Sequence, residues 1–369
     1  MTVAPKRVLI TGVSRFWGAE LAARLEADPD VEQIVAIDSE GPARELARTD
    51  VIRADLRHRL IGKLIRDLGI NTVIHAGLIV DPRGASGRRI HESNVIGTMN
   101  LMAACSGPDS PVRQLVVKSS TAIYGSEPDD PSFFSESMQR RSPARDSITR
   151  SIDEFENYIR DFSLRRADTT VTVLRFANVL GIENDTPFAS LFDLPVVPTV
   201  FGFDPRLQFI HEDDAVAAME HAVRANRPGV FNVGGDGIVV LSQAVAMLGK
   251  VNAPVLPFIA PGLAVAALQR LGLVDFPPHL ARLLQYGRVV DTTAMRDELG
   301  FTPGHTTLET VADYARRLRV RNVVDPDPYT YEADLERLLR SKARRLAGAT
   351  TSSRARAPRR TRKPASTAS

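Results

Sequence analysis

The sequence predicts an α/β protein whose main element is a doubly wound parallel sheet, with a smaller C-terminal lobe and a disordered basic tail. Three observations predict this class. Short apolar, β-branched runs alternate with helical patterns over residues 1–180. A glycine, Gly12, ends the first apolar run, and a helical pattern follows it. After residue 180 the alternation weakens and proline becomes frequent.

The apolar runs predict six strands, because they show little polar alternation and so suit strands that are buried on both faces. Helical patterns separate them, so helices are expected to cover both faces of the sheet. The predicted strands span 7–11, 32–38, 51–55, 71–77, 113–120 and 169–178. In this half the first predicted helix follows Gly12 and runs through Leu25, and the others span 58–69, 90–105 and 147–165. Residues 1–180 are therefore expected to form a Rossmann-type domain.

Residues 181–335 are expected to form a smaller substrate lobe that closes over a site, with the chain crossing between the two domains. Its pattern predicts helices at about 212–226 and 241–250 and a strand at 228–234. The segment 254–285 is apolar and punctuated by proline and glycine. This segment fits either core and lid packing or the wall of an apolar pocket.

The basic tail, residues 336–369, differs from the rest of the chain. Residues 337–369 hold eleven Lys and Arg residues and no acidic residue, so residues 1–336 carry 36 basic against 44 acidic side chains, a net charge of −8. Residues 348–369 have little to bury and are expected to be disordered. A short helix at about 331–346 precedes them. The tail suits an anionic membrane surface, a nucleic acid or simple solubilisation, and the sequence leaves all three open.

Composition argues against a membrane-spanning protein, a disulfide-stabilised protein and a histidine-based metal site. The chain has 369 residues, 43% of them hydrophobic, and no apolar window long enough for a spanning helix. The single cysteine, Cys105, allows no internal disulfide, lies in an apolar helix pattern and suits a cytoplasmic protein. No histidine spacing resembles a metal site, so none is predicted. The run His211 to Asp214 is expected to cap the helix that follows it.

A candidate phosphate-binding turn lies at residues 11–18, TGVSRFWG. Gly12 ends the first strand and permits a tight turn, while Gly18 in the first helical turn permits close packing of helix on strand. Backbone N–H groups of such a turn face an anion. Asp38 ends the second strand twenty positions after Gly18 and can accept hydrogen bonds from an adenosine ribose. Together these features predict a dinucleotide site.

Three bulky residues of this turn, Arg15, Phe16 and Trp17, belong to the predicted cofactor site but depart from a small glycine-rich loop. Arg15 can pair with a phosphate, including the 2′-phosphate of NADP, whereas Asp38 would repel that phosphate. We expect NAD, with NADP as the alternative. Trp17, the only tryptophan, suits helix packing better than stacking on a nucleotide.

Motifs from residue 7 to about residue 315 resemble those of extended short-chain dehydrogenases/reductases, in the NAD-dependent epimerase/dehydratase family, with a closer likeness to actinobacterial galactose-epimerase-like members. Their order along the chain carries the resemblance, since each motif is weak alone. The motifs are TGVSRFWG, IVAID, IRADLR, TVIHAG, NVIGTMNLMAAC, VVKSSTAIYG, LRFANVLG, FIHEDDAVAAM, VFNVGG and LGFTP.

The resemblance implies a role for each matching position. Asp55 would contact the adenine, and Leu56 would line its pocket. The backbone at His75, Ala76 and Gly77 would run beneath the pyrophosphate and nicotinamide ribose, with Asn94 behind the active site. Ser120 would be the catalytic hydroxyl that binds the reacting oxygen of the substrate. The remaining candidates, for substrate binding, are Tyr124, Asn178 and Arg206.

The usual proton-transfer pair of this family, a Tyr and a Lys four positions later, is missing. No tyrosine has a lysine at that spacing, and no lysine occurs between Lys118 and Lys250. Alignment through Glu156 places Ile148 and Ile152 at the two positions, within an apolar helical stripe. Whether the chain is an enzyme is therefore open: an oxidoreductase or epimerase with atypical acid/base groups, or an inactive dinucleotide-binding regulator or scaffold.

The substrate is also open. The family acts on nucleotide sugars, but Leu207 stands where an arginine would hold the diphosphate, with Arg206 one position away. The apolar segment 254–285 would instead suit a lipophilic alcohol, as in steroid dehydrogenase-like relatives. The resemblance is also compatible with a homodimer formed through the helices at 90–105 and 147–163.

Overall fold

The computed structural model describes residues 5–81, 86–107, 109–144, 146–184, 186–255 and 278–324. Residues Met1–Arg316 form one compact unit, and Arg317–Ser369 group separately. The expectations for the tail and for residues 256–277 of the apolar segment lie outside the described residues. No described helix is long and apolar enough to cross a membrane.

The centre of the first unit is a seven-stranded sheet in which all neighbours pair in parallel. Its strand order is β12–β7–β5–β4–β1–β2–β3. The bounds are β1 Lys6–Thr11, β2 Val31–Asp38, β3 Thr49–Arg53, β4 Thr72–His75, β5 Gln114–Ser120, β7 Thr170–Phe176 and β12 Gly229–Val233. The strand order reverses between β1 and β4, and crevices for ligands form at such a point. The predicted doubly wound sheet is confirmed.

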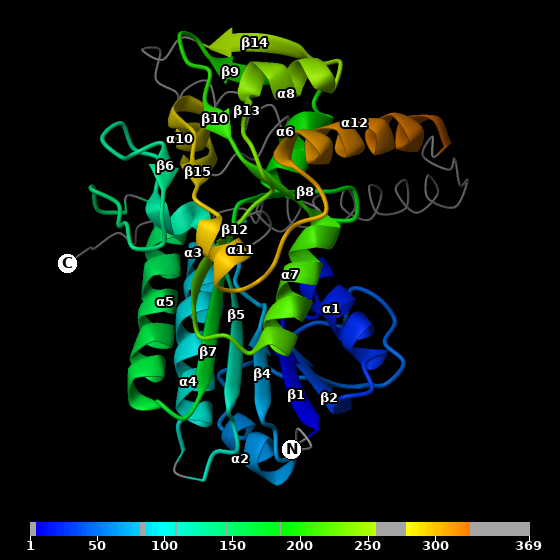
Figure 1. The fold of residues 1–369 in the computed structure, drawn as a ribbon, viewed down its shortest axis with the longest axis vertical. Coiled ribbons are helices and arrows are strands. Elements are labelled where there is room, and N and C mark those ends of the chain that lie inside the picture. The colour runs from blue at the N-terminus through cyan, green and yellow to red at the C-terminus, as the bar shows by residue number, and fades with distance from the viewer. Residues whose placement is uncertain are drawn as a thin grey trace, which may run out of the picture. The chain divides into compact units, whose positions relative to one another are not determined.

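Helices cover both faces of this sheet, and each face has its own hydrophobic core (Figure 1). On one face lie α1 Phe16–Glu26 and α7 Glu212–Ala225. On the other lie α2 Ile61–Asp67, α4 Thr98–Cys105 and α5 Ser147–Arg165. Cys105 is fully buried in this second core, and burial raises the pKa of its thiol to about 12, so the thiol is inert at neutral pH.

Helix α5 shows how the apolar stripe directs packing. Asp146 caps its N-terminus, with Oδ1 accepting a hydrogen bond of 2.8 Å from the Thr149 amide. The predicted stripe faces the sheet, and all its members are buried. They are Ile148, Ile152, Phe155, Ile159 and Phe162.

Three details differ from the predicted elements. The predicted strand at 228–234 is β12, and it joins the main sheet beside β7. The strand predicted at 169–178 ends at Phe176, and the chain then forms β8 Asn178–Leu180, which lies outside the main sheet. The helix predicted at 90–105 consists of α3 Gly87–His91, a π-helical turn η1 Glu92–Gly97, and α4.

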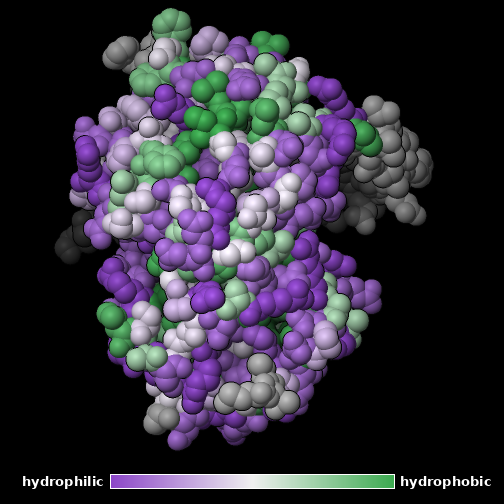
Figure 2. Space-filling model, viewed as in Figure 1, coloured by the Kyte–Doolittle hydropathy of each residue, from purple (hydrophilic) through white to green (hydrophobic). Residues whose placement is uncertain are grey.

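Smaller elements lie beyond the carboxyl ends of the main strands. The short strands are β6 Phe133–Phe134, β9 Val196–Val200, β10 Arg206–Leu207, β11 Phe209–His211, β13 Val239–Val240, β14 Val251–Val255 and β15 Val289–Val290. The helices are η2 Thr121–Tyr124, α6 Pro187–Asp193, α8 Leu241–Met247, α10 Pro278–Tyr286, α11 Thr293–Asp297 and α12 Thr307–Val324. Figure 2 shows hydrophobic residues gathered on the upper part of the face in view.

Candidate functional site

Two cavities open at the carboxyl ends of the central strands. The large cavity, about 760 Å³, is lined by the β1–α1 turn, the ends of β4, β5 and β7, and residues of α6 and α10. The small pocket, about 230 Å³, is lined by the tips of β1 and β2 and by the loop after β3. Ser14, Arg15 and Ile79 line both cavities, so the two spaces adjoin along the turn. This arrangement places one extended site at the point where the strand order reverses.

The two glycines of the turn allow its close packing. Gly12 has φ +86°, and a Cβ atom there would lie 2.7 Å from the Cα of Gly77. A Cβ on Gly18 would lie 2.5 Å from the Gly12 carbonyl oxygen. Arg15, at the N-cap of α1, has extended backbone and an exposed side chain that makes no cap, and the first turn of α1 holds no acidic residue. The Arg15 side chain therefore accepts no hydrogen bond from the backbone amides of the first turn of α1.

Asp38 lies at the tip of β2 beside this turn. Its Oδ2 accepts a hydrogen bond of 3.0 Å from the Ser14 amide. Asp38, Asp55 and Leu56 line the small pocket together, so the structure brings these predicted residues side by side. Asp55 accepts hydrogen bonds from the Arg57 guanidinium, which holds the pKa of that carboxyl below its usual value.

His75 lies at the end of β4 with its ring fully enclosed. Its Nδ1 is 2.6 Å from the Thr11 hydroxyl, and its Nε2 is 2.8 Å from the Thr98 hydroxyl. Burial, with a smaller effect of the positive charge of Lys118, lowers the pKa of His75 to about 4, so the ring is neutral near pH 7. The ring therefore ties β4 to β1 and α4, while Ala76 borders the large cavity and Gly77 the small pocket.

Asn94 lies in the π-helical turn and binds the chain that follows β4. Its Oδ1 accepts from the Ile79 amide at 2.8 Å, and its Nδ2 donates to the Ile79 carbonyl at 2.7 Å. The same amide group donates to the Ser151 hydroxyl on α5 at 3.1 Å. Asn94 thus fixes the cavity wall at Ile79 to α5.

Of the predicted catalytic and substrate-binding residues, Ser120 and Asn178 line the large cavity, whereas Tyr124 and Arg206 do not. The Ser120 Oγ accepts a 3.2 Å hydrogen bond from the Ala122 amide. The Tyr124 hydroxyl is buried, donating to Asn232 Oδ1 at 2.7 Å and accepting from Arg175 at 2.8 Å. The Arg206 side chain is exposed on β10.

Trp17 is 9% exposed, and its ring centre lies 5.7 Å from that of Phe176, so it packs in the core as predicted. Both residues also line the large cavity. On α5, Ile148 and Ile152 are 3% and 0% exposed and do not line the cavity. The two positions to which the family resemblance assigns the proton-transfer pair therefore lie in closed hydrophobic core.

Lys118, a residue that the sequence analysis passed over, lines the large cavity from β5. It is 5% exposed, and its ammonium lies 5.0 Å from the centre of the Trp17 ring. Burial, together with the nearby charge of Arg15, lowers the pKa of Lys118 to about 8. The available signal was a lysine directly after the apolar run Leu115–Val117, within a buried strand.

Arg288 is a second residue that the sequence analysis missed. It is 7% exposed, lines the large cavity, and donates from Nη1 to the Gly125 carbonyl and the Ser126 hydroxyl. Its Nε is buried and has no hydrogen-bond partner among the described residues. A parallel bridge pairs Arg288 with Leu207, the position at which the family resemblance implies an arginine. No sequence pattern links positions 207 and 288, because only folding brings them together.

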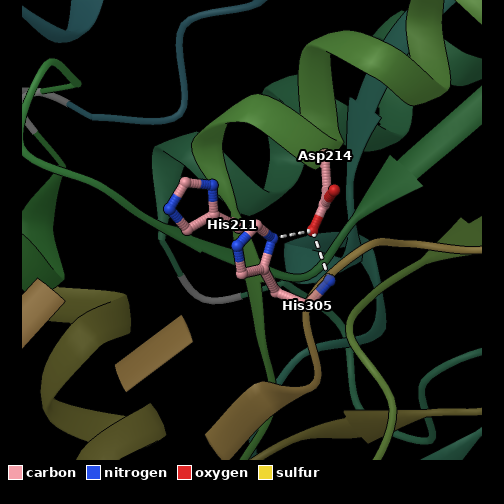
Figure 3. A group of neighbouring side chains, drawn as sticks. All are labelled: His211, Asp214 and His305. Carbon is pink, nitrogen blue, oxygen red and sulfur yellow. Dashed lines mark hydrogen bonds and ion pairs between the residues drawn. The ribbon is translucent and has the colours of Figure 1, made fainter. Parts of the chain in front are cut away.

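A histidine pair lies at the start of α7 (Figure 3). His211 caps α7, as predicted, with Nδ1 accepting from the Asp213 amide. Asp214 accepts from the Gly304 amide and from the amide and Nδ1 of His305. Ligand-type atoms of His211, Asp214 and His305 lie within 4.8 Å of one another. Because these hydrogen bonds already use Asp214 and His211, the cluster acts as a link between α7 and the loop before α12.

The chain resembles known proteins over most of its length. Residues 8–234 match the family described as the NAD dependent epimerase/dehydratase family. An uncharacterized protein of Mycobacterium tuberculosis is 41% identical over 331 residues, 87% of this chain and 86% of that protein. The ADP-L-glycero-D-manno-heptose-6-epimerase of Cupriavidus pinatubonensis is 25% identical over 85% of this chain and 99% of its own.

Solved structures share the fold. MoeE5 in complex with UDP-glucose and NAD is 23% identical, covers 86% of this chain and 99% of its own, and superposes with a TM-score of 0.62. DesIV, a dTDP-glucose 4,6-dehydratase from Streptomyces venezuelae with NAD bound, is 21% identical over 86% of this chain and 98% of its own, with a TM-score of 0.65. The matched residues and the 41% identical relative together show that this chain belongs to the NAD dependent epimerase/dehydratase family.

Proposed function

We propose that this chain binds NAD along the two adjoining cavities, with the adenosine end in the small pocket and the nicotinamide end in the large cavity. The observation that carries the proposal is the junction at the β1–α1 turn. There Asp38 lies beside the Ser14 amide, and α1 begins without a side-chain cap. Helix N-termini of this kind bind phosphate groups.

The residues present fit such a cofactor. The tight approach of Gly12 to Gly77 leaves no side chain above the ends of β1 and β4. The Arg15 side chain is exposed, so its bulk does not fill the turn. Asp38 and Asp55 offer carboxylate oxygens to ribose or adenine donors in the small pocket. The carboxylate of Asp38 favours NAD over NADP, because it would repel a 2′-phosphate.

We propose that the bound NAD serves an oxidoreductase or epimerase reaction on a nucleotide sugar. NAD supplies the hydride acceptor, and the chain supplies binding and proton transfer. Ser120 is proposed to bind the reacting oxygen, and Asn178 to face the substrate, since both line the large cavity. Arg288 is proposed to bind the diphosphate, since a buried guanidinium with a free Nε is suited to a phosphate oxygen.

Calorimetric titration of the full chain with NAD, NADH and NADP tests the cofactor proposal. Wild-type chain should bind NAD or NADH in preference to NADP. Asp38→Asn should weaken NAD binding about 10- to 100-fold, because a charged hydrogen-bond acceptor is lost. Asp50→Asn is the matched control: Asp50 is an exposed carboxylate on β3 outside the small pocket, and its loss should leave affinity unchanged. Folded chain that binds neither NAD nor NADH would contradict the proposal.

A second candidate function is NAD binding without turnover. The buried Ile148 and Ile152 favour it, because they remove the family's usual proton-transfer pair. Hydride exchange separates the two functions: the NAD-loaded chain is mixed with UDP-glucose, UDP-glucuronic acid or dTDP-glucose, and NADH absorbance is followed. Absorbance that appears with one of these sugars supports the enzyme. Tight NAD binding without any exchange supports the regulator.

A further inference from the structure

The large cavity contains one amine among the described residues, that of Lys118. Alternate residues of a strand point to opposite faces of its sheet. On β5, Val117 packs in the core beneath α5, and the Ser119 hydroxyl donates to Glu156 on α5. This alternation directs Lys118 and Ser120 to the opposite side. Lys118, Ser119 and Ser120 all border the cavity, but the Ser119 hydroxyl is held by Glu156. The strand therefore presents an amine and a hydroxyl, two residues apart, to the same space.

The ammonium of Lys118 has no hydrogen bond or ion pair with any described residue. The groups that face it are the Trp17 ring, the positive Arg15 of the turn and the neutral His75 of β4. Three carboxylates line the cavity as well, Glu20, Asp81 and Glu183. Of these, Glu20 is paired with Arg24 and Arg44. Burial without an ion-pair partner favours the neutral amine and lowers the pKa of Lys118 to about 8. A group that transfers protons is most effective when its pKa lies near the operating pH, and a pKa of about 8 meets that condition close to neutrality.

The family's usual source of proton transfer is absent from this cavity, since Ile148 and Ile152 are buried away from it. We propose that Lys118, acting beside Ser120, is the proton-transferring residue of the large cavity in place of a tyrosine–lysine pair on α5. This inference rests on the proposed function as an NAD-dependent enzyme. It assigns the proton chemistry to the opposite face of the sheet from the one that α5 covers.

The proposed step balances in atoms and charge. When a substrate carbinol is oxidised, its C–H bond breaks and the hydride passes to NAD. The O–H bond breaks as well, and its proton passes to the neutral amine of Lys118, which becomes an ammonium. The Ser120 hydroxyl donates a hydrogen bond to the reacting oxygen and orients it. Reduction of the ketone returns the hydride from NADH and the proton from the ammonium.

The single tryptophan provides a direct readout, because the Lys118 ammonium lies 5.0 Å from its ring. We expect the fluorescence of Trp17 in the full chain to change with pH, with an inflection near pH 8. Lys118→Met removes the charge and Lys118→Arg retains it at all these pH values, so neither variant should show the inflection. Lys250→Met is the control for other titrating groups, such as the α-amino group, and should keep it. An inflection that persists in both Lys118 variants, or is absent from wild-type chain, overturns the proposal.

Hydride exchange with UDP-glucose, UDP-glucuronic acid or dTDP-glucose completes the test. In wild-type chain the oxidation rate should rise with pH and level off above about pH 8. Lys118→Met and Lys118→Arg should each slow exchange about 100-fold or more while NAD affinity changes less than about threefold. Exchange that survives in both variants, or wild-type chain that binds NAD and exchanges with none of these sugars, overturns the role of Lys118. Failure of wild-type chain to bind NAD overturns the proposed function instead, and the Trp17 titration separates the two outcomes.

Discussion

Glu156 of α5 and Arg175 of β7 form a two-pronged ion pair, with Arg175 Nη2 2.6 Å from Oε2 and Nε 3.0 Å from Oε1. The side chains are 10% and 11% exposed. Ser119 donates to the same carboxylate, and Arg175 donates to the Tyr124 hydroxyl. This network fixes α5 to the ends of β5 and β7, next to the proposed catalytic wall.

Removing the Glu156 charge should destabilise the chain strongly. Glu156→Gln leaves the Arg175 guanidinium nearly buried without its counter-ion, and the expected loss is about 3–5 kcal/mol of unfolding free energy. Glu32→Gln is the matched control, because Glu32 pairs with Arg7 at the surface with both side chains well exposed, and its loss should change the unfolding free energy far less. Urea denaturation of both variants measures the difference. Equal losses would contradict the structural role of the buried pair.

His75 should make the chain sensitive to acid. Its folded-state pKa is about 4, below the ordinary 6.5, so the unfolded chain binds the proton more readily. Above about pH 6.5 the ring is neutral in both states, so its protonation does not affect folding. As the pH falls toward 4, the unfolded chain takes up a proton that the folded chain does not, and the unfolding free energy decreases by about 3 kcal/mol in total.

Denaturation at a series of pH values checks this effect. His75→Gln cannot titrate and should show a flatter dependence of stability on pH between 6.5 and 4. His58→Gln removes an exposed histidine and should retain the wild-type slope. A wild-type slope in the His75 variant would show that other groups cause the acid sensitivity.

Gly12 and Gly202 form a matched pair for testing the turn. Both have positive φ, +86° and +83°, but a Cβ on Gly12 would strike the Gly77 backbone while nothing lies within 4 Å of one on Gly202. Gly12→Ala should therefore abolish NAD binding and cost more stability than Gly202→Ala, by at least about 1–3 kcal/mol. Thermal melts and NAD calorimetry measure both effects. Full NAD affinity in folded Gly12→Ala would argue against the turn as the phosphate site.

Arg288 should control affinity for the substrate diphosphate and leave the cofactor unaffected. Arg288→Met should weaken binding of UDP-glucose about 10- to 100-fold, because a charged hydrogen-bond donor is lost from the cavity. Arg206→Met removes the exposed arginine of the neighbouring strand β10 and should have no effect. Calorimetry with UDP-glucose on NAD-loaded chain checks both variants. The reverse pattern would assign the diphosphate to Arg206, which the sequence offered only as a general candidate for substrate binding.

The site could be predicted only in part from the sequence. The glycine turn and Asp38 were predicted from their places at strand ends, and Asp55 and Ser120 from the family resemblance. All of them border the two cavities, because parallel strands bring their carboxyl ends to one edge. Tyr124 and Arg206 were predicted to bind substrate from their positions in motifs, and a motif does not determine whether a side chain points into the cavity. Neither residue lines the large cavity. Tyr124 points into the network of Asn232 and Arg175, away from the large cavity.

The sequence by itself predicted the order of strands and helices, a turn suited to phosphate, and the absence of a tyrosine with a lysine four positions later, because these depend on local periodicity and spacing. Only the tertiary structure decided that Lys118 faces the cavity without an ion-pair partner among the described residues, and that Arg288 lies beside Leu207. Burial, partner choice and pKa arise from contacts between segments far apart in the chain. For that reason, the two charged groups on which the proposed chemistry depends could be identified only from the folded chain.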